Sequence, residues 1–261
     1  MKVFLVLEET SFYQPTFVAE LLQNQAYEFV GAALVTKVPP KYSLGKYLQK
    51  NWHYLNMKEL IRLVNTRLKL ELKSRLIRKN QTKKHYNVAS VLKAFTVDFV
   101  KVEYNINKEE YVKFIASKEP DVILSSNPLL FKSEILSIPK ICCINRHSSI
   151  LPGYKGLLPV FHAYRKGEEY TGVTIHTMEK KIDAGVILAQ GKVNIEPGDT
   201  IDTLYQKCFQ ISARLCFEAL ERIRVGQLKD IISQNEMEPS YYSFPTKEDW
   251  GDFRKRKGRF I

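Results

Sequence analysis

The sequence CINRHSSILPGYKGLLPVFHAY, residues 143–164, joins the end of an apolar run to a tightly specified loop. The run KICCIN (140–145) predicts a strand, and Asn145 and His147 stand where that strand ends. Because they are two residues apart, an extended backbone directs both side chains to the same face. Leu-Pro, two glycines and a second proline follow within a dozen residues, which indicates a constrained loop.

Strand and helix signals alternate over most of the chain. We expect strands at residues 1–7, 27–35, 98–104, 121–126, 140–145, 171–179 and 185–194. We expect helices within 11–24, 108–120, 127–139 and 158–168, and a longer one over 211–228 that stops at Gly226. The alternation predicts an α/β fold with a mostly parallel sheet and right-handed crossovers. Such sheets bind ligands beyond the carboxyl ends of their strands, where Asn145 and His147 are expected.

The net charge of +12 comes from one segment of the chain. Residues 37–84 hold 14 Lys and Arg against two Glu, whereas the remainder balances, with 26 basic and 26 acidic residues. Apolar residues recur at intervals of four in this segment, which predicts one face of an amphipathic helix. The residues on that face are Leu60, Val64, Leu68, Leu72 and Leu76. Three interpretations are open: contact with tRNA phosphates, docking on an anionic membrane surface, or packing against the domain or a second subunit of a homodimer.

Several function classes find no support in the sequence. The apolar run from Val3 to Leu7 is too short for a signal peptide, and no run approaches the roughly 18 apolar residues of a spanning helix, so we expect a cytoplasmic protein. Cysteines at 142, 143, 208 and 216 fit neither a disulfide framework nor a zinc site, so we expect reduced thiols and no metal. No GxGxxG, GxxxxGK[ST] or GxSxG motif follows a strand, which disfavours dinucleotide, P-loop and esterase chemistry.

Asp183 lies 36 residues after His147, between two predicted strands, and completes a candidate set with Asn145. An amide can donate to a developing oxyanion, a histidine can exchange a proton near neutral pH, and an aspartate can orient that histidine. No serine or cysteine stands beside them as a clear nucleophile, which favours direct acyl transfer to a substrate amine. Each residue also has an ordinary structural explanation: a satisfied strand-end histidine, an asparagine cap and an Asx-turn.

Three motifs resemble those of the folate-dependent formyltransferases, a family that includes methionyl-tRNA, glycinamide ribonucleotide and sugar N-formyltransferases. They are N-R-H-S-S-I-L-P-G-Y-K-G, T-G-V-T-I-H-x-M and I-D-A-G-V-I-L. The close match covers residues 121–195, and the order of strands extends it to 1–228. The resemblance implies a Rossmann-like catalytic domain over 1–228 with a basic helical insertion at 37–90, followed by a short C-terminal extension at 229–261.

The resemblance also implies N10-formyltetrahydrofolate as formyl donor and assigns roles to individual residues. Asn145 would polarise the formyl oxygen, His147 would assist proton transfer, and Asp183 would position that histidine and take part in the proton relay. The pterin pocket would be lined by Asn127, Pro128, Leu129, Leu130, Met178 and Ile182. Ser149 would shape the loop under the site, and Lys155-Gly156 would contact an anionic part of the substrate. Asn127-Pro128 departs from the aromatic-glycine pair common in the tRNA enzyme.

The acceptor amine is the least determined part of the prediction. About 33 residues follow the last expected helix, too few for the C-terminal barrel of the tRNA enzyme. We therefore expect an amino sugar carried by a nucleotide, with aminoacyl-tRNA as the alternative and hydrolysis of the formyl donor as a further alternative. The loop with Ser11 and Tyr13 either faces the substrate or simply connects a strand to a helix.

Overall fold

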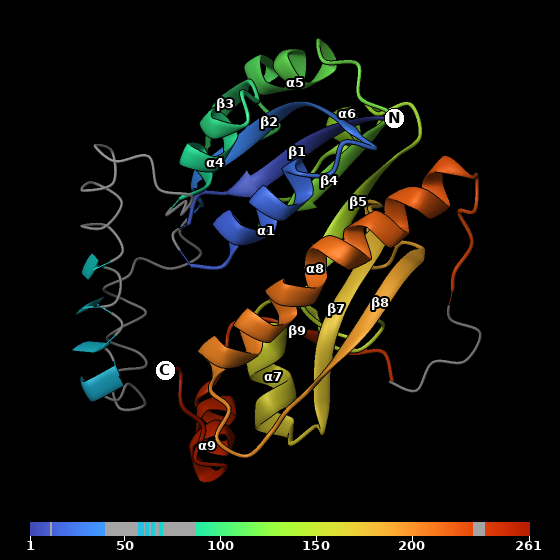
Figure 1. The fold of residues 1–261 in the computed structure, drawn as a ribbon. Coiled ribbons are helices and arrows are strands. Elements are labelled where there is room, and N and C mark those ends of the chain that lie inside the picture. The colour runs from blue at the N-terminus through green and yellow to red at the C-terminus, as the bar shows by residue number, and fades with distance from the viewer. Residues whose placement is uncertain are drawn as a thin grey trace.

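The computed structural model describes residues 1–10, 12–39, 57–59, 61–62, 64–65, 68–69, 87–231 and 238–261. These residues form a seven-stranded sheet in the order β3-β2-β1-β4-β5-β7-β8 (Figure 1). Its strands are β1 (Lys2–Glu8), β2 (Glu28–Lys37), β3 (Phe99–Glu103), β4 (Val122–Ser126), β5 (Cys142–His147), β7 (Tyr170–Thr177) and β8 (Ile187–Asn194). Two further short strands, β6 (Lys155–Gly156) and β9 (Tyr241–Tyr242), pair with each other.

The sheet is mostly parallel, as the sequence predicts. Strands β3, β2, β1, β4 and β5 pair with one another in parallel, whereas β7 is antiparallel to both of its neighbours, β5 and β8. Strand β1 reads KVFLVLE, and Val3 to Leu7 are fully buried. A continuous apolar run of this kind is typical of a strand covered on both faces.

Helices cover both faces of the sheet (Figure 1). The helices are α1 (Gln14–Leu22), α4 (Val88–Ala94), α5 (Glu109–Ala116), α6 (Ser133–Leu136), α7 (Pro159–Lys166), α8 (Ile201–Arg224) and α9 (Lys247–Lys255). Side chains of α1, α4 and α8 share one apolar core with one face of the sheet, and those of α5 and α6 share a second core with the other face. Because the two cores occupy both faces of the sheet, the ends of the strands remain available to line a site.

Helix α8 begins ten residues before the predicted helix over 211–228, because a capping box defines its first turn. The Thr200 hydroxyl accepts from the backbone N–H of Thr203, and the Thr203 hydroxyl accepts from that of Thr200. This pair satisfies two backbone donors that the start of a helix otherwise leaves without partners. The helix ends at Arg224, close to the predicted stop at Gly226.

The described part of the predicted C-terminal extension packs into the main core. Trp250 and Phe253 of α9 are buried, and the Phe253 ring centroid lies 4.8 Å from that of Phe161 on α7. Arg165 of α7 forms an ion pair of 2.7 Å with Asp249 of α9. Residues 238–261 therefore share the core of the predicted catalytic domain. The sequence indicates neither α9 nor β9, since the tail is polar and aromatic without a clean period.

Most of the predicted basic insertion lies outside the described residues. Its described residues between 57 and 69 are helical, and at its two ends Lys37 closes β2 and Val88 begins α4. Val64 and Leu68, on the predicted apolar face, are 49% and 50% exposed, so the described part of that face is not buried in the monomer. Glu59 forms an ion pair of 2.8 Å with Arg254 of α9. Within the described residues, no helix has the length and apolarity needed to cross a bilayer.

We expect Phe253→Ala to lower the free energy of unfolding by about 3–5 kcal/mol, because it empties a fully buried aromatic site. Lys255→Ala on the same helix is the matched control, since its side chain is 81% exposed and should change stability by about 0.5 kcal/mol or less. Urea unfolding of the whole chain measures both. Equal effects of the two substitutions would contradict the shared core.

Candidate active site

Asn145 and His147 lie at the carboxyl end of β5 and point to the same face, as their spacing predicts. His147 is buried, and Asn145 is partly buried. The antiparallel register of β5 and β7 places Asn145 directly opposite His176. The amide Nδ2 of Asn145 lies 3.4 Å from His176 Nε2. A second histidine therefore enters the predicted set of site residues.

Asp183 lies in the connection between β7 and β8 and faces both histidines. Its Oδ2 is 3.7 Å from His147 Nδ1, and its Oδ1 is 3.6 Å from His176 Nε2. The backbone N–H of Gly156 donates to Oδ2 at 2.9 Å. Asp183 has a φ of 48°, a left-handed conformation that aspartate tolerates better than most residues. The three residues predicted from the sequence thus converge within one small volume.

The charge states follow from burial and from these partners. Burial alone would raise the pKa of Asp183, but His176, His147 and the Gly156 N–H outweigh it, so the pKa falls below its usual range. Burial lowers the pKa of His147 below its ordinary value, although Asp183 and the Tyr154 carbonyl oppose that shift. The site near neutral pH therefore holds an ionised aspartate beside a neutral imidazole.

Backbone carbonyls fix which nitrogen of each imidazole carries the hydrogen. A carbonyl oxygen only accepts, so His147 Nε2–H donates to Tyr154 O at 2.9 Å and leaves Nδ1 as the basic nitrogen facing Asp183. His176 Nδ1–H donates to Thr177 O at 2.8 Å, and its Nε2 lies between the Asn145 amide at 3.4 Å and Asp183 Oδ1 at 3.6 Å. In this arrangement His176 orients Asn145, and His147 can take up a proton.

His176 is a site residue that the sequence prediction missed. It stands inside the quoted motif T-G-V-T-I-H-x-M, but a histidine within a strand has no local signal that distinguishes it from a core residue. The signal lies in the pairing of β5 with β7, which places His176 beside Asn145. That pairing is a property of the sheet and is absent from the spacing along the chain.

The loop after β5 contains a cis peptide bond and three residues with positive φ. The bond is Leu151-Pro152, and the residues are Tyr154 at 60°, Gly156 at 92° and Leu158 at 50°. A Cβ on Gly156 would lie 2.2 Å from the Tyr242 carbonyl oxygen, so the close approach of β9 requires glycine there. Ser149 is fully buried and donates to Gly153 O at 3.0 Å, so it braces the loop from beneath.

The residues predicted to line a pterin pocket lie in two segments. One follows β4, the strand beside β5, and the other lies in the connection between β7 and β8. Asn127 Oδ1 accepts from the Leu129 N–H at 2.8 Å and holds the turn that includes Pro128. Leu130 in this turn is 65% exposed, and Ile182 beside Asp183 is 39% exposed. Met178 packs against the same core as Leu129. The two segments thus border one core, and each exposes an apolar side chain to solvent.

The predicted substrate residues are placed in different ways. Ser11 lies outside the described residues. Tyr13 turns toward α8, where its hydroxyl donates to Asp202 and its ring stacks on Tyr205. Lys155 and Gly156 form β6 beside the site, and Lys155 is half-buried. Of this set, the segment Lys155–Gly156 touches the candidate catalytic residues directly, through the Gly156 N–H.

Arg146 points away from Asn145 and His147, toward the core under α1 and α8. Its Nε donates to Ser212 at 2.8 Å and its Nη2 to Ser148 at 2.9 Å. The guanidinium carbon lies 3.7 Å from the Phe209 ring centroid. Burial lowers its pKa. Hydroxyl groups and an aromatic face therefore satisfy this buried cation.

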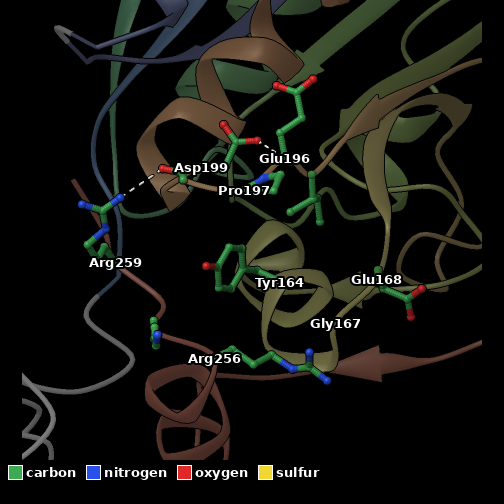
Figure 2. A pocket seen from close by; sticks show the side chains of 11 residues that line it. Tyr164, Gly167, Glu168, Glu196, Pro197, Asp199, Arg256 and Arg259 are labelled. Atoms are coloured by element: carbon green, nitrogen blue, oxygen red, sulfur yellow. Dashed lines mark hydrogen bonds between the residues drawn. The ribbon is translucent and has the colours of Figure 1, made fainter.

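A cavity of about 590 Å³ lies away from these residues, between α7, the segment that leads into α8 and the C-terminal tail (Figure 2). Tyr164, Glu168, Asp199 and Arg256 line it, and the Arg259 guanidinium donates to Gly198 O at 3.1 Å at its rim. None of the catalytic, cofactor-binding or substrate-binding residues predicted from the sequence lines this cavity. Within the described residues, no group of three His, Cys, Asp or Glu side chains could hold a metal ion, and the four cysteines are unpaired.

The fold resembles those of solved formyltransferases. A phosphoribosylglycinamide formyltransferase from Anaplasma phagocytophilum matches with a TM-score of 0.62 and 13% identity, over 93% of this chain and 99% of that one. A sugar N-formyltransferase from Shewanella matches with a TM-score of 0.60 and 17% identity, over 99% of this chain and 89% of that one. Residues 2–220 match the sequence model of the formyl transferase family, and the chain belongs to that family.

Curated relatives include methionyl-tRNA formyltransferases. The Thermotoga maritima protein is 35% identical over 163 residues, which cover 62% of this chain and 51% of the relative. The Bacillus thuringiensis protein is 37% identical over 150 residues, which cover 57% of this chain and 47% of the relative. The chain thus spans about half the length of the curated relatives it matches.

We expect Gly156→Ala to destabilise the protein by about 3 kcal/mol or more, because it adds a clash with Tyr242 O to the strain of a positive φ. Gly198→Ala is the matched control. Gly198 has a φ of 96°, but the space where a Cβ would lie is open, so backbone strain alone should cost about 1–2 kcal/mol. Thermal unfolding compares the two. A Gly156→Ala loss no larger than that of Gly198→Ala would contradict the close approach of β9.

The pKa of His147 gives a second test. In NMR titration we expect its imidazole, identified by the signal lost in His147→Gln, to titrate below the ordinary value of 6.5. In Asp183→Asn it should titrate lower still, because the carboxylate that favours the imidazolium is removed. A raised pKa in Asp183→Asn would contradict the placement of the two groups.

Proposed function

We propose that this protein transfers a formyl group from N10-formyltetrahydrofolate to a primary amine. The observation that supports it best is the convergence of Asn145, His147 and Asp183. His147 lies 3.7 Å from Asp183, and His176 links Asn145 to Asp183 through distances of 3.4 and 3.6 Å. Membership in the formyl transferase family supports the same reaction. The reaction breaks the bond between the formyl carbon and N10 of the donor and forms a bond from that carbon to the amine nitrogen.

In this proposal Asn145 stabilises charge on the formyl oxygen. As the amine adds to the formyl carbon, that oxygen gains negative charge, and an amide N–H directed at it lowers the barrier. One hydrogen of Nδ2 faces His176 Nε2, so the other is free to donate to the formyl oxygen. The histidine thus decides the orientation of the amide before substrate arrives.

His147 takes the proton that the amine loses when the new bond forms. Its lowered pKa keeps Nδ1 unprotonated near neutral pH, and Nδ1 is the nitrogen that faces Asp183. The ionised carboxylate then stabilises the imidazolium at 3.7 Å. The proton leaves His147 for N10 of the departing folate or for water, which restores the neutral imidazole.

The residues near the site fit a folate in chemical character. A pterin ring needs apolar walls and hydrogen-bonding groups at its edge, and Leu130 and Ile182 both present exposed apolar surface. In the proposal Asn127, Pro128, Leu129 and Leu130 form one wall, and Met178 and Ile182 form the other.

For the acceptor we propose an amino sugar carried by a nucleotide. The structural likeness to a sugar N-formyltransferase extends over 99% of this chain and supports this choice through the fold. The second candidate is aminoacyl-tRNA, which the 35% identity to a methionyl-tRNA formyltransferase favours. The basic segment 37–84 suits the phosphates of either acceptor, and contact with an anionic membrane surface or a second subunit is a further proposal for it.

We expect Asn145→Ala, His147→Ala and Asp183→Ala each to lower kcat by about 100-fold or more while the protein stays folded. His176→Ala should cost about 10- to 100-fold, because it acts through Asn145 and Asp183. Steady-state transfer of labelled formyl measures these effects. Asp98→Asn is the control, since Asp98 is an exposed residue whose ion pair with Lys118 lies far from the site. Near-normal turnover in His147→Ala or Asp183→Ala would contradict the catalytic roles proposed for these residues.

An acceptor panel decides the substrate. Labelled N10-formyltetrahydrofolate is incubated with the protein and either nucleotide-linked amino sugars, charged initiator tRNA or no amine. We expect label to appear on an amino sugar. Label on tRNA alone would replace the proposed acceptor, and rapid release of formate without any amine would replace transfer by hydrolysis.

A further inference from the structure

A short strand from the C-terminal tail pairs with the loop that follows β5. Strand β9 runs parallel to β6, with Lys155 opposite Tyr241 and Gly156 opposite Tyr242. The backbone N–H groups of Lys155 and Leu157 donate to Ser240 O and Tyr242 O, each at 2.9 Å. The Ser240 N–H in turn donates to Pro152 O at 3.3 Å. The tail therefore supplies the hydrogen-bonding edge on which this loop is built.

The same loop holds both candidate acid–base residues from its backbone. Tyr154 O accepts the Nε2–H of His147, and Gly156 N–H donates to Asp183, each at 2.9 Å. Tyr154 has a φ of 60°, a conformation that its own sequence does not favour and that its surroundings must impose. The direction of the Tyr154 carbonyl thus depends on how the loop is held.

One side chain of the tail bonds directly to this residue. The Ser240 hydroxyl accepts from the Tyr154 N–H at 2.9 Å. The Tyr154 and Tyr242 rings stack with centroids 5.4 Å apart and planes 17° apart. Tyr154 is therefore held by the tail at its amide and at its ring, while its carbonyl holds His147.

The strand is fixed to α7 on its other side. The Tyr242 ring stacks on the His162 imidazole at 4.4 Å, and His162 Nε2–H donates to Ser243 O at 3.1 Å. Burial lowers the pKa of His162 to about 4, so this imidazole is neutral near neutral pH. Arg165 donates to His162 Nδ1 at 3.0 Å and pairs with Asp249 of α9. The anchoring is consequently independent of pH near neutrality.

We propose that the C-terminal segment 240–242, Ser240 and the strand β9 that follows it, is a positioning element of the active site, which acts through Tyr154 and Gly156 on His147 and Asp183. The proposal rests on the proposed formyl transfer and adds to it a second segment, outside the matched family region 2–220, on which the rate depends. Ser240 is its most specific residue, because its hydroxyl fixes the amide of the residue whose carbonyl orients the base.

The test compares Ser240→Ala with Ser240→Thr, which keeps the hydroxyl, and with Thr246→Ala, which removes the N-cap of α9 without touching β9. We expect Ser240→Ala to lower kcat about tenfold and to leave KM for the folate within about twofold, because small misplacements of catalytic groups lower the rate more than binding. The hydrogen bond from His147 to Tyr154 O should weaken in this variant, which lowers the pKa of His147 and moves the acidic limb of the kcat–pH profile to lower pH. Ser240→Thr should restore both, and Thr246→Ala should lower the melting temperature alone.

The result that overturns the proposal is a Ser240→Ala protein with the wild-type kcat and pH profile and a stability loss like that of Thr246→Ala. A direct readout separates this outcome from failure of the proposed function. If no amine accepts formyl from the wild-type protein, NMR titration of His147 still compares the variants. A pKa of His147 lowered in Ser240→Ala and restored in Ser240→Thr supports the positioning role, and identical titrations in all variants refute it.

Discussion

The contact between the Asp183 carboxylate and two imidazoles is the interaction on which the site depends. Asp183 Oδ2 lies 3.7 Å from His147 Nδ1, and Oδ1 lies 3.6 Å from His176 Nε2. The Gly156 N–H donates to Oδ2. Three separate elements meet there: β5, β7 with its connection to β8, and the loop that contains β6. A buried carboxylate without these partners would be costly, so the charge and the surrounding fold stabilise one another.

The geometry also explains why the antiparallel end of the sheet matters. A purely parallel sheet would place another strand end beside β5 at this edge. Strand β7 instead runs back along β5 and places His176 opposite Asn145, while its far end delivers the turn that holds Asp183. The amide, the base and the carboxylate therefore come from one local piece of antiparallel structure at the edge of a parallel sheet.

The sequence predicts those parts of the site that follow from the spacing of residues along the chain. Asn145 and His147 follow from period two at a strand end, and the α/β fold follows from the alternation of strands and helices. His176 was missed because its role arises from strand pairing. Strand β9 was missed because two tyrosines have no period and their partner lies 86 residues away in the sequence. Ser149 and Tyr13 were predicted as substrate residues, but the sequence does not show their surroundings. Ser149 is buried, and Tyr13 turns toward α8.

We propose that Asn145, His147 and Asp183 surround the formyl group of the bound donor. A crystal structure of the protein with a stable analogue of N10-formyltetrahydrofolate, in the absence of amine, tests it most directly. We expect the formyl oxygen to lie within hydrogen-bonding distance of Asn145 Nδ2, and the pterin to lie between the segments 127–130 and 178–182. An analogue bound elsewhere, for example in the cavity beside α7 and the C-terminal tail, would contradict it.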